Sequence, residues 1–208
     1  MPVKSQQRHD GTMDQTDAWN EFYRSNGRAW RGSTRLPDPL GGSGRALDIG
    51  CGSGKSASTL IGLGYDVTGI DTSSEAVSIC EERFGDSASF LCGSVLDIPA
   101  PESSFDYVVA VHVLEHVADD DMARAASEIR RVLKPGGWLF IRDFAPGDMR
   151  EERRSGSVIE YNHRLPEEIA GFFDGFKVVS AQKVEERTRF GTIRMRSELR
   201  LLAVPPAS

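Results

Sequence analysis

The stretch that decides the fold is Leu47-Asp48-Ile49-Gly50-Cys51-Gly52-Ser53-Gly54. Residues 46–50 are mostly apolar and predict a short buried strand, and residues 53–63 predict a helix directly after it. Glycines between a strand and a helix let backbone N–H groups approach a ligand closely, and the N-terminus of the helix favours negative charge. We therefore expect a nucleotide-like ligand to bind at this turn.

The spacing of the glycines separates the known types of ligand-binding turn. A phosphate-binding loop of the G-x-x-x-x-G-K-[ST] type that ends at residues 54–56 would need its first glycine at Ile49. The dinucleotide pattern G-x-G-x-x-G, started at Gly50, would need a glycine at Lys55. That pattern also gives the acidic Asp48 no role. An NAD-dependent oxidoreductase is therefore the less favoured alternative.

The pattern D-x-G-x-G-x-G resembles the first motif of the class I S-adenosylmethionine-dependent methyltransferases. Their cofactor is a cation, so an acid near it is favourable. Asp71 at the end of the next strand, residues 105–117 (FDYVVAVHVLEHV) and residues 131–139 (RVLKPGGWL) resemble later motifs, in the order and spacing of small metabolite-type members. The resemblance covers about residues 45–145, and the chain is identified as a member of that family.

Apolar runs alternate with helical patterns, which predicts a doubly wound α/β sheet. The expected helices cover residues 14–26, 53–63, 73–84 and 119–133, with another starting near 166. The expected strands cover residues 46–50, 65–71, 88–92, 105–111, 138–144, 176–184 and 197–204. The last two have no helical pattern between them, which predicts antiparallel neighbours. The resemblance implies a three-layer, Rossmann-like, seven-stranded and mostly parallel sheet of order 3-2-1-4-5-7-6 with an antiparallel last strand.

The length of 208 residues, with 39% hydrophobic and 27% charged residues, fits one globular domain. We expect residues 1–13 to form a disordered tail and residues 14–208 to form a single methyltransferase domain. Within it, residues 14–44 are expected to form an N-terminal helical lid and linker. Residues 144–164 are too long for an ordinary connection and are a candidate substrate loop.

Composition also limits location and partners. The polar N-terminus and the lack of a long apolar run predict a cytoplasmic protein without membrane association. With 25 Lys and Arg against 31 Asp and Glu, the net charge is −6, so direct nucleic-acid binding is not expected. Three cysteines without a C-x-x-C pair indicate reduced thiols. The oligomeric state is not predicted.

The resemblance implies which residues contact the cofactor. Asp71 would bind the ribose hydroxyls and Thr72 would lie beside the adenine. Ser94 stands where the family often has aspartate, and its hydroxyl or the carboxylate of Asp97 would accept a hydrogen bond from the adenine amino group. The expected cofactor residues are Tyr23, Arg31, Asp48, Gly50, Cys51, Gly52, Gly54, Asp71, Thr72, Ser94, Val95, Val111 and His112.

Two of these assignments belong to the lid. Tyr23 or Arg31 would bind the methionine carboxylate, and packing of the aromatic residues on the sheet is an equally good interpretation of the same pattern. The backbone of Val111 and His112 would face the methionine amino group.

Methyl transfer mainly requires alignment, and a base is needed only if the acceptor carries a proton at neutral pH. The candidate bases are His112, His163 and Asp143, each with a purely structural role as the alternative. Glu115 and His116 are expected to cap or pack the turn. The sequence has no obvious metal-ligand spacing, so we predict a metal-independent reaction that converts S-adenosylmethionine to S-adenosylhomocysteine on a small-molecule acceptor. A non-catalytic or partner-dependent S-adenosylmethionine-binding protein, including one that methylates RNA or protein with a partner, is a further alternative.

Overall fold

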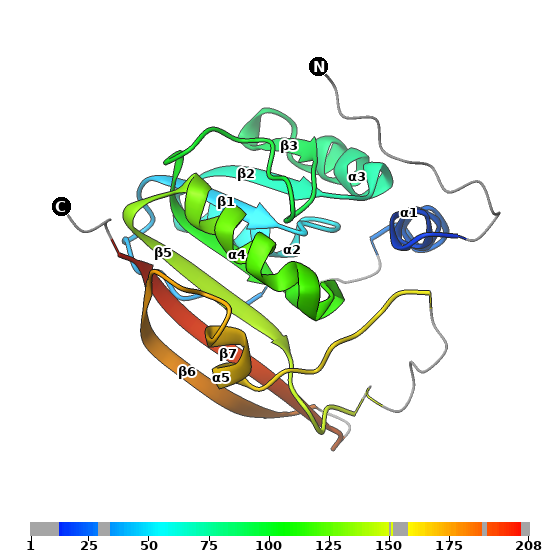
Figure 1. The fold of residues 1–208 in the computed structure, drawn as a ribbon. Helices are drawn as coiled ribbons and strands as arrows, with labels where there is room; N and C mark the ends of the chain where they lie inside the picture. Colours follow the sequence, from blue (N-terminus) through cyan, green and yellow to red (C-terminus); the bar gives the residue numbers. More distant parts are fainter. Residues whose placement is uncertain (1–12, 29–33, 150, 152–157, 189–190, 205–208) are drawn as a thin grey trace.

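The computed structural model describes residues 13–28, 34–149, 151, 158–188 and 191–204. In this part of the chain, seven strands form one sheet in the order β3-β2-β1-β4-β5-β7-β6 (Figure 1). The strands are β1 (Arg45–Ile49), β2 (Asp66–Asp71), β3 (Ser89–Cys92), β4 (Phe105–Val111), β5 (Leu133–Phe144), β6 (Phe176–Arg187) and β7 (Ile193–Ala203). The predicted Rossmann-like sheet and its strand order are confirmed.

The strands β1 to β5 run parallel, and β7 is antiparallel to both of its neighbours, β5 and β6. The predicted antiparallel last strand is therefore confirmed. Because the parallel strands share one direction, their carboxyl ends meet at the same edge of the sheet, where α/β folds of this kind bind ligands.

Helices cover both faces of the sheet. The helices are α1 (Gln15–Asn26), α2 (Lys55–Leu63), α3 (Ser74–Phe84), α4 (Asp119–Val132) and α5 (Pro166–Ala170). Residues of α4 and α5 belong to the core on one face, where Figure 1 shows α4, and residues of α2 and α3 belong to the core on the other. Met122, Ala126 and Ile129 of α4 are buried in the larger core, as their spacing predicts. Residues of α2 and α3 pack with Ala46, Tyr107 and other residues in a second core. Among the described residues, no helix has the length and apolar character needed to cross a membrane.

Three strands are longer than the sequence predicts. Strand β5 already begins at Leu133, because residues 134–137 form an irregularity between the pairs Phe105–Leu133 and Tyr107–Trp138 instead of a separate turn. Strands β6 and β7 continue pairing to Arg187–Ile193. A tight connection in which the N–H of Thr188 donates to the carbonyl of Thr192 keeps their ends together, so the ladder extends through residues that carry no apolar pattern.

Helix α1 begins after Asp14, whose Oδ1 accepts a hydrogen bond from the N–H of Asp17 at 2.8 Å. It docks onto the start of α3, where Asn20 Oδ1 accepts from the hydroxyl of Ser73 at 2.8 Å and Arg24 pairs with Glu75 at 2.9 Å. These contacts place α1 next to the glycine turn. Residues 1–12 of the predicted tail lie outside the described residues.

Candidate active site

A cavity of about 870 Å³ lies at the carboxyl ends of the parallel strands. It extends from the turn after β1 to the β6–β7 hairpin, and α1 contributes to its wall. The predicted cofactor residues that line it are Tyr23, Gly50, Cys51, Gly52, Asp71, Thr72, Ser94, Val95, Val111 and His112. The structure therefore brings these residues, which come from five separate parts of the chain, to one site.

The glycine turn has a backbone that only glycine fits well. Gly50 and Gly52 have φ angles of +63° and +51°. A Cβ atom on Gly50 would lie 2.4 Å from Cγ2 of Val113, and one on Gly52 would lie 2.5 Å from the hydroxyl oxygen of Tyr23. The turn is thus packed closely on both sides, and its backbone is held at the cavity surface.

Asp71 connects the glycine turn to the next strand end. Its Oδ2 accepts from the N–H of Gly52 and its Oδ1 accepts from the N–H of Ser73, both at 2.9 Å. Burial raises the pKa of this carboxyl group, and the backbone hydrogen bonds partly oppose that effect. Each oxygen of a carboxylate has two lone pairs, so both oxygens retain acceptor capacity for a pair of hydroxyl groups.

Asp48 and Gly54 lie beneath the cavity surface and do not line it. Asp48 is 1% exposed, and burial raises its pKa to about 8. Its Oδ2 has no hydrogen-bond partner in the part of the chain that the structure describes. A Cβ on Gly54 would lie 2.3 Å from Phe84, so this glycine permits the helix to pack closely. The resemblance implied direct cofactor contact for both residues, whereas the geometry places them in support of the turn.

At the end of the cavity that is expected to hold the adenine, Ser94 and Val95 line the wall, and Asp97 is exposed outside it. The Ser94 hydroxyl oxygen accepts from the N–H of Leu96 at 3.1 Å, which leaves its own O–H and a second lone pair for a ligand. Of the two alternatives for the adenine amino group, the geometry favours Ser94. Arg31, the other predicted lid residue, lies outside the described residues.

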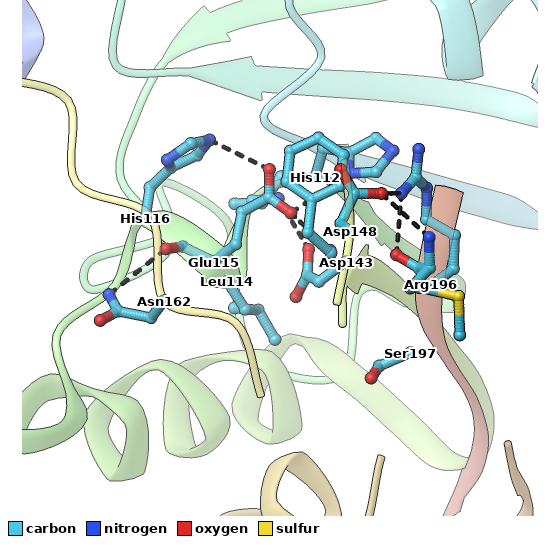
Figure 2. A network of polar contacts seen from close by, with 12 residues as sticks. His112, Leu114, Glu115, His116, Asp143, Asp148, Asn162, Arg196 and Ser197 are labelled. Carbon is cyan, nitrogen blue, oxygen red and sulfur yellow. Dashed lines mark hydrogen bonds and ion pairs between the residues drawn. The ribbon is translucent and has the colours of Figure 1, made fainter. Parts of the chain in front are cut away.

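His112 occupies the middle of the cavity wall, just after β4. Its φ of +60° is unusual for a residue other than glycine, and its N–H donates to the carbonyl of Arg142 at 2.8 Å. Its Nδ1 lies 3.2 Å from Oε2 of Glu115, and its ring lies 4.5 Å from that of Phe144 (Figure 2). The imidazole is therefore oriented by a carboxylate on one side and an aromatic ring on the other.

Glu115 is 1% exposed and interacts with two histidines. Besides His112, its Oε1 lies 3.6 Å from Nε2 of His116, and its Oε2 accepts from the N–H of Phe144 at 2.7 Å. Burial opposes ionisation, but His112, then His116 and the Phe144 N–H, lower the pKa of Glu115 below its usual value. The sequence predicted only that Glu115 and His116 cap or pack the turn. In the structure both residues also line the cavity. The spacing of His112, Glu115 and His116 at i, i+3 and i+4 is the sequence feature that could have indicated their contact.

The other two candidate bases do not line the cavity. Asp143 is 2% exposed, and its Oδ1 accepts from the N–H of Val113 at 3.1 Å. Burial and the neighbouring charge of Glu115 raise the pKa of Asp143 well above its usual value. His163 stacks on Phe144 at 6.0 Å and has a buried, unpartnered Nε2 within the described part of the chain. Of the three candidates, His112 alone faces the cavity.

One grouping could hold a metal ion. Ligand atoms of His112, Glu115 and Asp143 all lie within 4.8 Å of one another, which the sequence did not lead us to expect (Figure 2). The Asp143 carboxyl group already accepts a backbone hydrogen bond, and burial and the charge of Glu115 raise its pKa, which opposes the ionised form that a metal ion requires. The prediction of a metal-independent reaction stays a prediction.

The far half of the cavity is aromatic on one side and strongly charged on the other. Trp19, His116, Tyr161 and Phe144 form a row of rings, with neighbouring centroids 5.2 Å, 4.6 Å and 6.2 Å apart in that order. The charged side consists of Glu186, Arg142, Arg194 and Arg196. Tyr161 and Glu160 come from the predicted substrate loop, residues 144–164, of which residues 150 and 152–157 lie outside the described part.

Comparison with known proteins identifies the family. A family model described as a methyltransferase domain matches residues 47–141. The chain belongs to the class I S-adenosylmethionine-dependent methyltransferases. The NAD-dependent oxidoreductase alternative is therefore set aside.

Relatives and solved structures agree with this assignment. The methyltransferase is 37% identical over 106 residues to an O-methyltransferase of Aspergillus nomiae, covering 48% of this chain and 46% of the relative. It is 31% identical over 130 residues to a human tRNA N(3)-cytidine methyltransferase. That match covers 57% of this chain and 34% of the human relative. A crystal structure of an S-adenosylmethionine-dependent methyltransferase from Methanosarcina mazei is 26% identical, covers 79% of this chain and 94% of that chain, and has a TM-score of 0.65. The chain spans about half the length of the first curated relatives.

Proposed function

We propose that this methyltransferase transfers the methyl group of S-adenosylmethionine to a small-molecule acceptor and releases S-adenosylhomocysteine. The observation that supports this most is the continuity of the cavity. The glycine turn with Asp71 lies at one end, the His112–Glu115 pair lies in the middle, and a row of aromatic rings lies at the other end. Its volume of about 870 Å³ is in the upper part of the range of small-molecule pockets, roughly 300–1,000 Å³.

The residues at the first end fit the cofactor chemically. Asp71 would accept hydrogen bonds from both ribose hydroxyls with the acceptor capacity that its backbone bonds leave free. Ser94 would bind the adenine amino group, and Thr72 and Val95 would lie against the ring. The close backbone of Gly50, Cys51 and Gly52 would face the ribose and methionine part. The backbone of Val111 and His112 would bind the methionine amino group. Tyr23 of α1 would cover the site and exclude water.

When bound, S-adenosylmethionine supplies a methyl group on a positively charged sulfur, which needs alignment more than activation. His112 would remove a proton from the acceptor. The lowered pKa of Glu115 keeps this carboxylate ionised, so Nδ1 of His112 carries the hydrogen that it donates to Oε2. Nε2 is then left with a free lone pair to accept the proton, and the Glu115 charge stabilises the imidazolium that forms.

Two observations favour a small molecule as acceptor. The A. nomiae relative is named as an O-methyltransferase, and the net charge of −6 disfavours unaided binding to a polyanion. The human relative is named as a tRNA methyltransferase, so tRNA is the second acceptor class to test.

The test has two parts. Calorimetry of the full chain should show micromolar binding of S-adenosylhomocysteine and no binding of NAD. Transfer of a radiolabelled methyl group should then be measured with a metabolite extract and with bulk tRNA, for the protein and for His112→Ala. We expect label in the metabolite fraction, and an unchanged S-adenosylhomocysteine affinity with reduced transfer in the variant. Binding without transfer to either pool would support the non-catalytic or partner-dependent alternative, and absence of binding would refute the proposal.

A further inference from the structure

Three arginines gather on one face of the sheet at the far end of the cavity. Arg142 lies on β5, and Arg194 and Arg196 lie on β7, two residues apart and hence on the same face. The register pairs Phe144 of β5 with Arg196 of β7, which brings the arginines next to the row of aromatic rings. All three arginines line the cavity. This part of the wall has no role in the cofactor site proposed above.

Three acids lie around these arginines and form ion pairs with two of them. Arg142 pairs with Glu186 and, at 3.3 Å, with Glu198. Arg196 pairs with the buried Asp148, as Figure 2 shows. Arg194 forms no ion pair with any residue that the structure describes. Asp148 and Glu198 do not line the cavity, so Glu186 is the acid that these three arginines share at its surface. Arg194, which faces Glu186 across the β6–β7 ladder, is therefore the arginine of these three that has no ion pair at the cavity surface.

Two of the guanidinium groups also have an Nε–H without a hydrogen-bond acceptor among the described residues. The Nε atoms of Arg194 and Arg196 are buried and have no partner within the described residues. Arg196 is 3% exposed, and its Nη1 donates hydrogen bonds to Oδ2 of Asp148 and to the carbonyl oxygen of Met195. A buried N–H of a charged group without an acceptor is costly, and an oxyanion on the ligand would satisfy it. The planar fork of a guanidinium matches a carboxylate in particular.

Phe144 is 3% exposed and fills the space between the His112 ring and the guanidinium group of Arg196. The Phe144 ring lies 4.5 Å from the His112 ring, and the guanidinium carbon of Arg196 lies 4.6 Å from the centre of the Phe144 ring. Tyr161 continues the same surface at 6.2 Å from Phe144. An aromatic ligand that packs against His112 and Tyr161, beside the buried Phe144, would have one edge near His112 and the opposite edge near Arg194 and Arg196.

We propose that the methyl acceptor is an aromatic carboxylic acid whose carboxylate binds Arg194 and Arg196 and whose methylated atom lies near Nε2 of His112. This inference rests on the methyltransferase function proposed above and specifies its substrate class. A monoanion matches the single guanidinium without an ion pair. A phosphate monoester carries about −1.5 to −2 charges and would leave negative charge uncompensated beside Glu186. The alternating arginines, which the sequence shows as R-M-R-S-E, therefore form a carboxylate subsite.

The experiment uses the full chain saturated with S-adenosylhomocysteine, so that cofactor binding is established first. Benzoate, the neutral benzamide and phenyl phosphate are then titrated by calorimetry. Benzoate should bind about ten-fold or more tightly than benzamide, which corresponds to a charge-assisted bidentate contact, and more tightly than phenyl phosphate. Equal affinities of benzoate and benzamide, no binding of benzoate at millimolar concentration, or a preference for phenyl phosphate would each overturn the proposal.

Three variants locate the effect. Arg194→Met should reduce benzoate affinity to that of benzamide. The matched control Arg200→Met changes an arginine on the same strand and face that lies outside this cavity, so it should leave the preference intact. Glu186→Gln removes a competing acid and should tighten benzoate binding, which keeps the test informative if Arg194→Met fails to fold. Equal losses with Arg194→Met and Arg200→Met, or weaker binding with Glu186→Gln, would contradict the subsite. Failure of S-adenosylhomocysteine to bind the unmodified chain would instead refute the proposed function itself.

Discussion

Gly52→Ala should weaken S-adenosylhomocysteine binding, because this glycine touches both the cofactor site and α1. A side chain at its φ of +51° costs about 1–2 kcal/mol. The new Cβ would also lie 2.5 Å from the hydroxyl oxygen of Tyr23, and overpacking of this kind costs about 1–3 kcal/mol. Together these effects predict a loss of about 2–5 kcal/mol, divided between protein stability and cofactor affinity.

The overpacking cost of Gly52→Ala depends on the hydroxyl oxygen of Tyr23. Tyr23→Phe removes it, and the next atom of the side chain, Cζ, lies 3.5 Å from the Cβ position, which is an ordinary contact. Gly52→Ala should therefore cost about 1–3 kcal/mol less in the Tyr23→Phe background, summed over protein stability and cofactor affinity. Both single variants, the double variant and the unmodified protein form a double-mutant cycle, measured by calorimetry and thermal unfolding. Additivity within about 0.5 kcal/mol would show that α1 does not pack on the turn in solution.

Three further predictions concern the carboxylates of the site. Asp71→Ala should weaken S-adenosylhomocysteine binding by about 1–3 kcal/mol in calorimetry, through loss of charged hydrogen bonds to ribose and of support for Gly52, and an unchanged dissociation constant would remove Asp71 from the site. Burial raises the pKa of Asp48 to about 8, so its contribution to stability is complete below the unfolded-state value of about 3.9 and is lost as the pH rises through 8. The melting temperature of Asp48→Asn minus that of the unmodified protein should accordingly increase from about pH 5 to about pH 9, and a constant difference would contradict a raised pKa of this buried carboxyl group. Methyl transfer should be unaffected by a chelator such as EDTA, and loss of activity that added metal restores would instead assign a metal ion to the grouping of His112, Glu115 and Asp143.

Most of the cofactor end follows from local sequence. A strand, three glycines with left-handed backbone and a helix occupy consecutive residues, and Asp71 ends the next parallel strand. In a parallel sheet these ends meet at one edge, so the sequence order alone brings them together. The sequence did not show how deep each side chain lies. Asp48 and Gly54 support the turn from beneath because side chains alternate between the two faces of β1 and because α2 packs closely on the turn.

The catalytic assignments depended on burial, which sequence patterns indicate poorly for polar residues. His112, His163 and Asp143 all occur near strand ends or in the long loop, and position along the chain placed His112 first without excluding the other two. In the fold, Asp143 is buried and His163 stacks on Phe144, and neither lines the cavity, while His112 does. Glu115 became significant through its two histidine contacts, one of which joins residues three apart on a turn whose shape no periodicity predicts.

The sequence by itself determined the class of fold, the strand order implied by its family motifs, and the place of the cofactor turn, because these depend on backbone preferences and on the order of elements along the chain. The tertiary structure decided the part of the cavity to which we assign the methyl acceptor. Arg142, Phe144, Arg194 and Arg196 come from two strands that are separated by about fifty residues and that pair side by side in the sheet. Alternating arginines on a strand are also typical of a solvent-exposed face, and only the register and the packing of the aromatic rings placed them in a cavity.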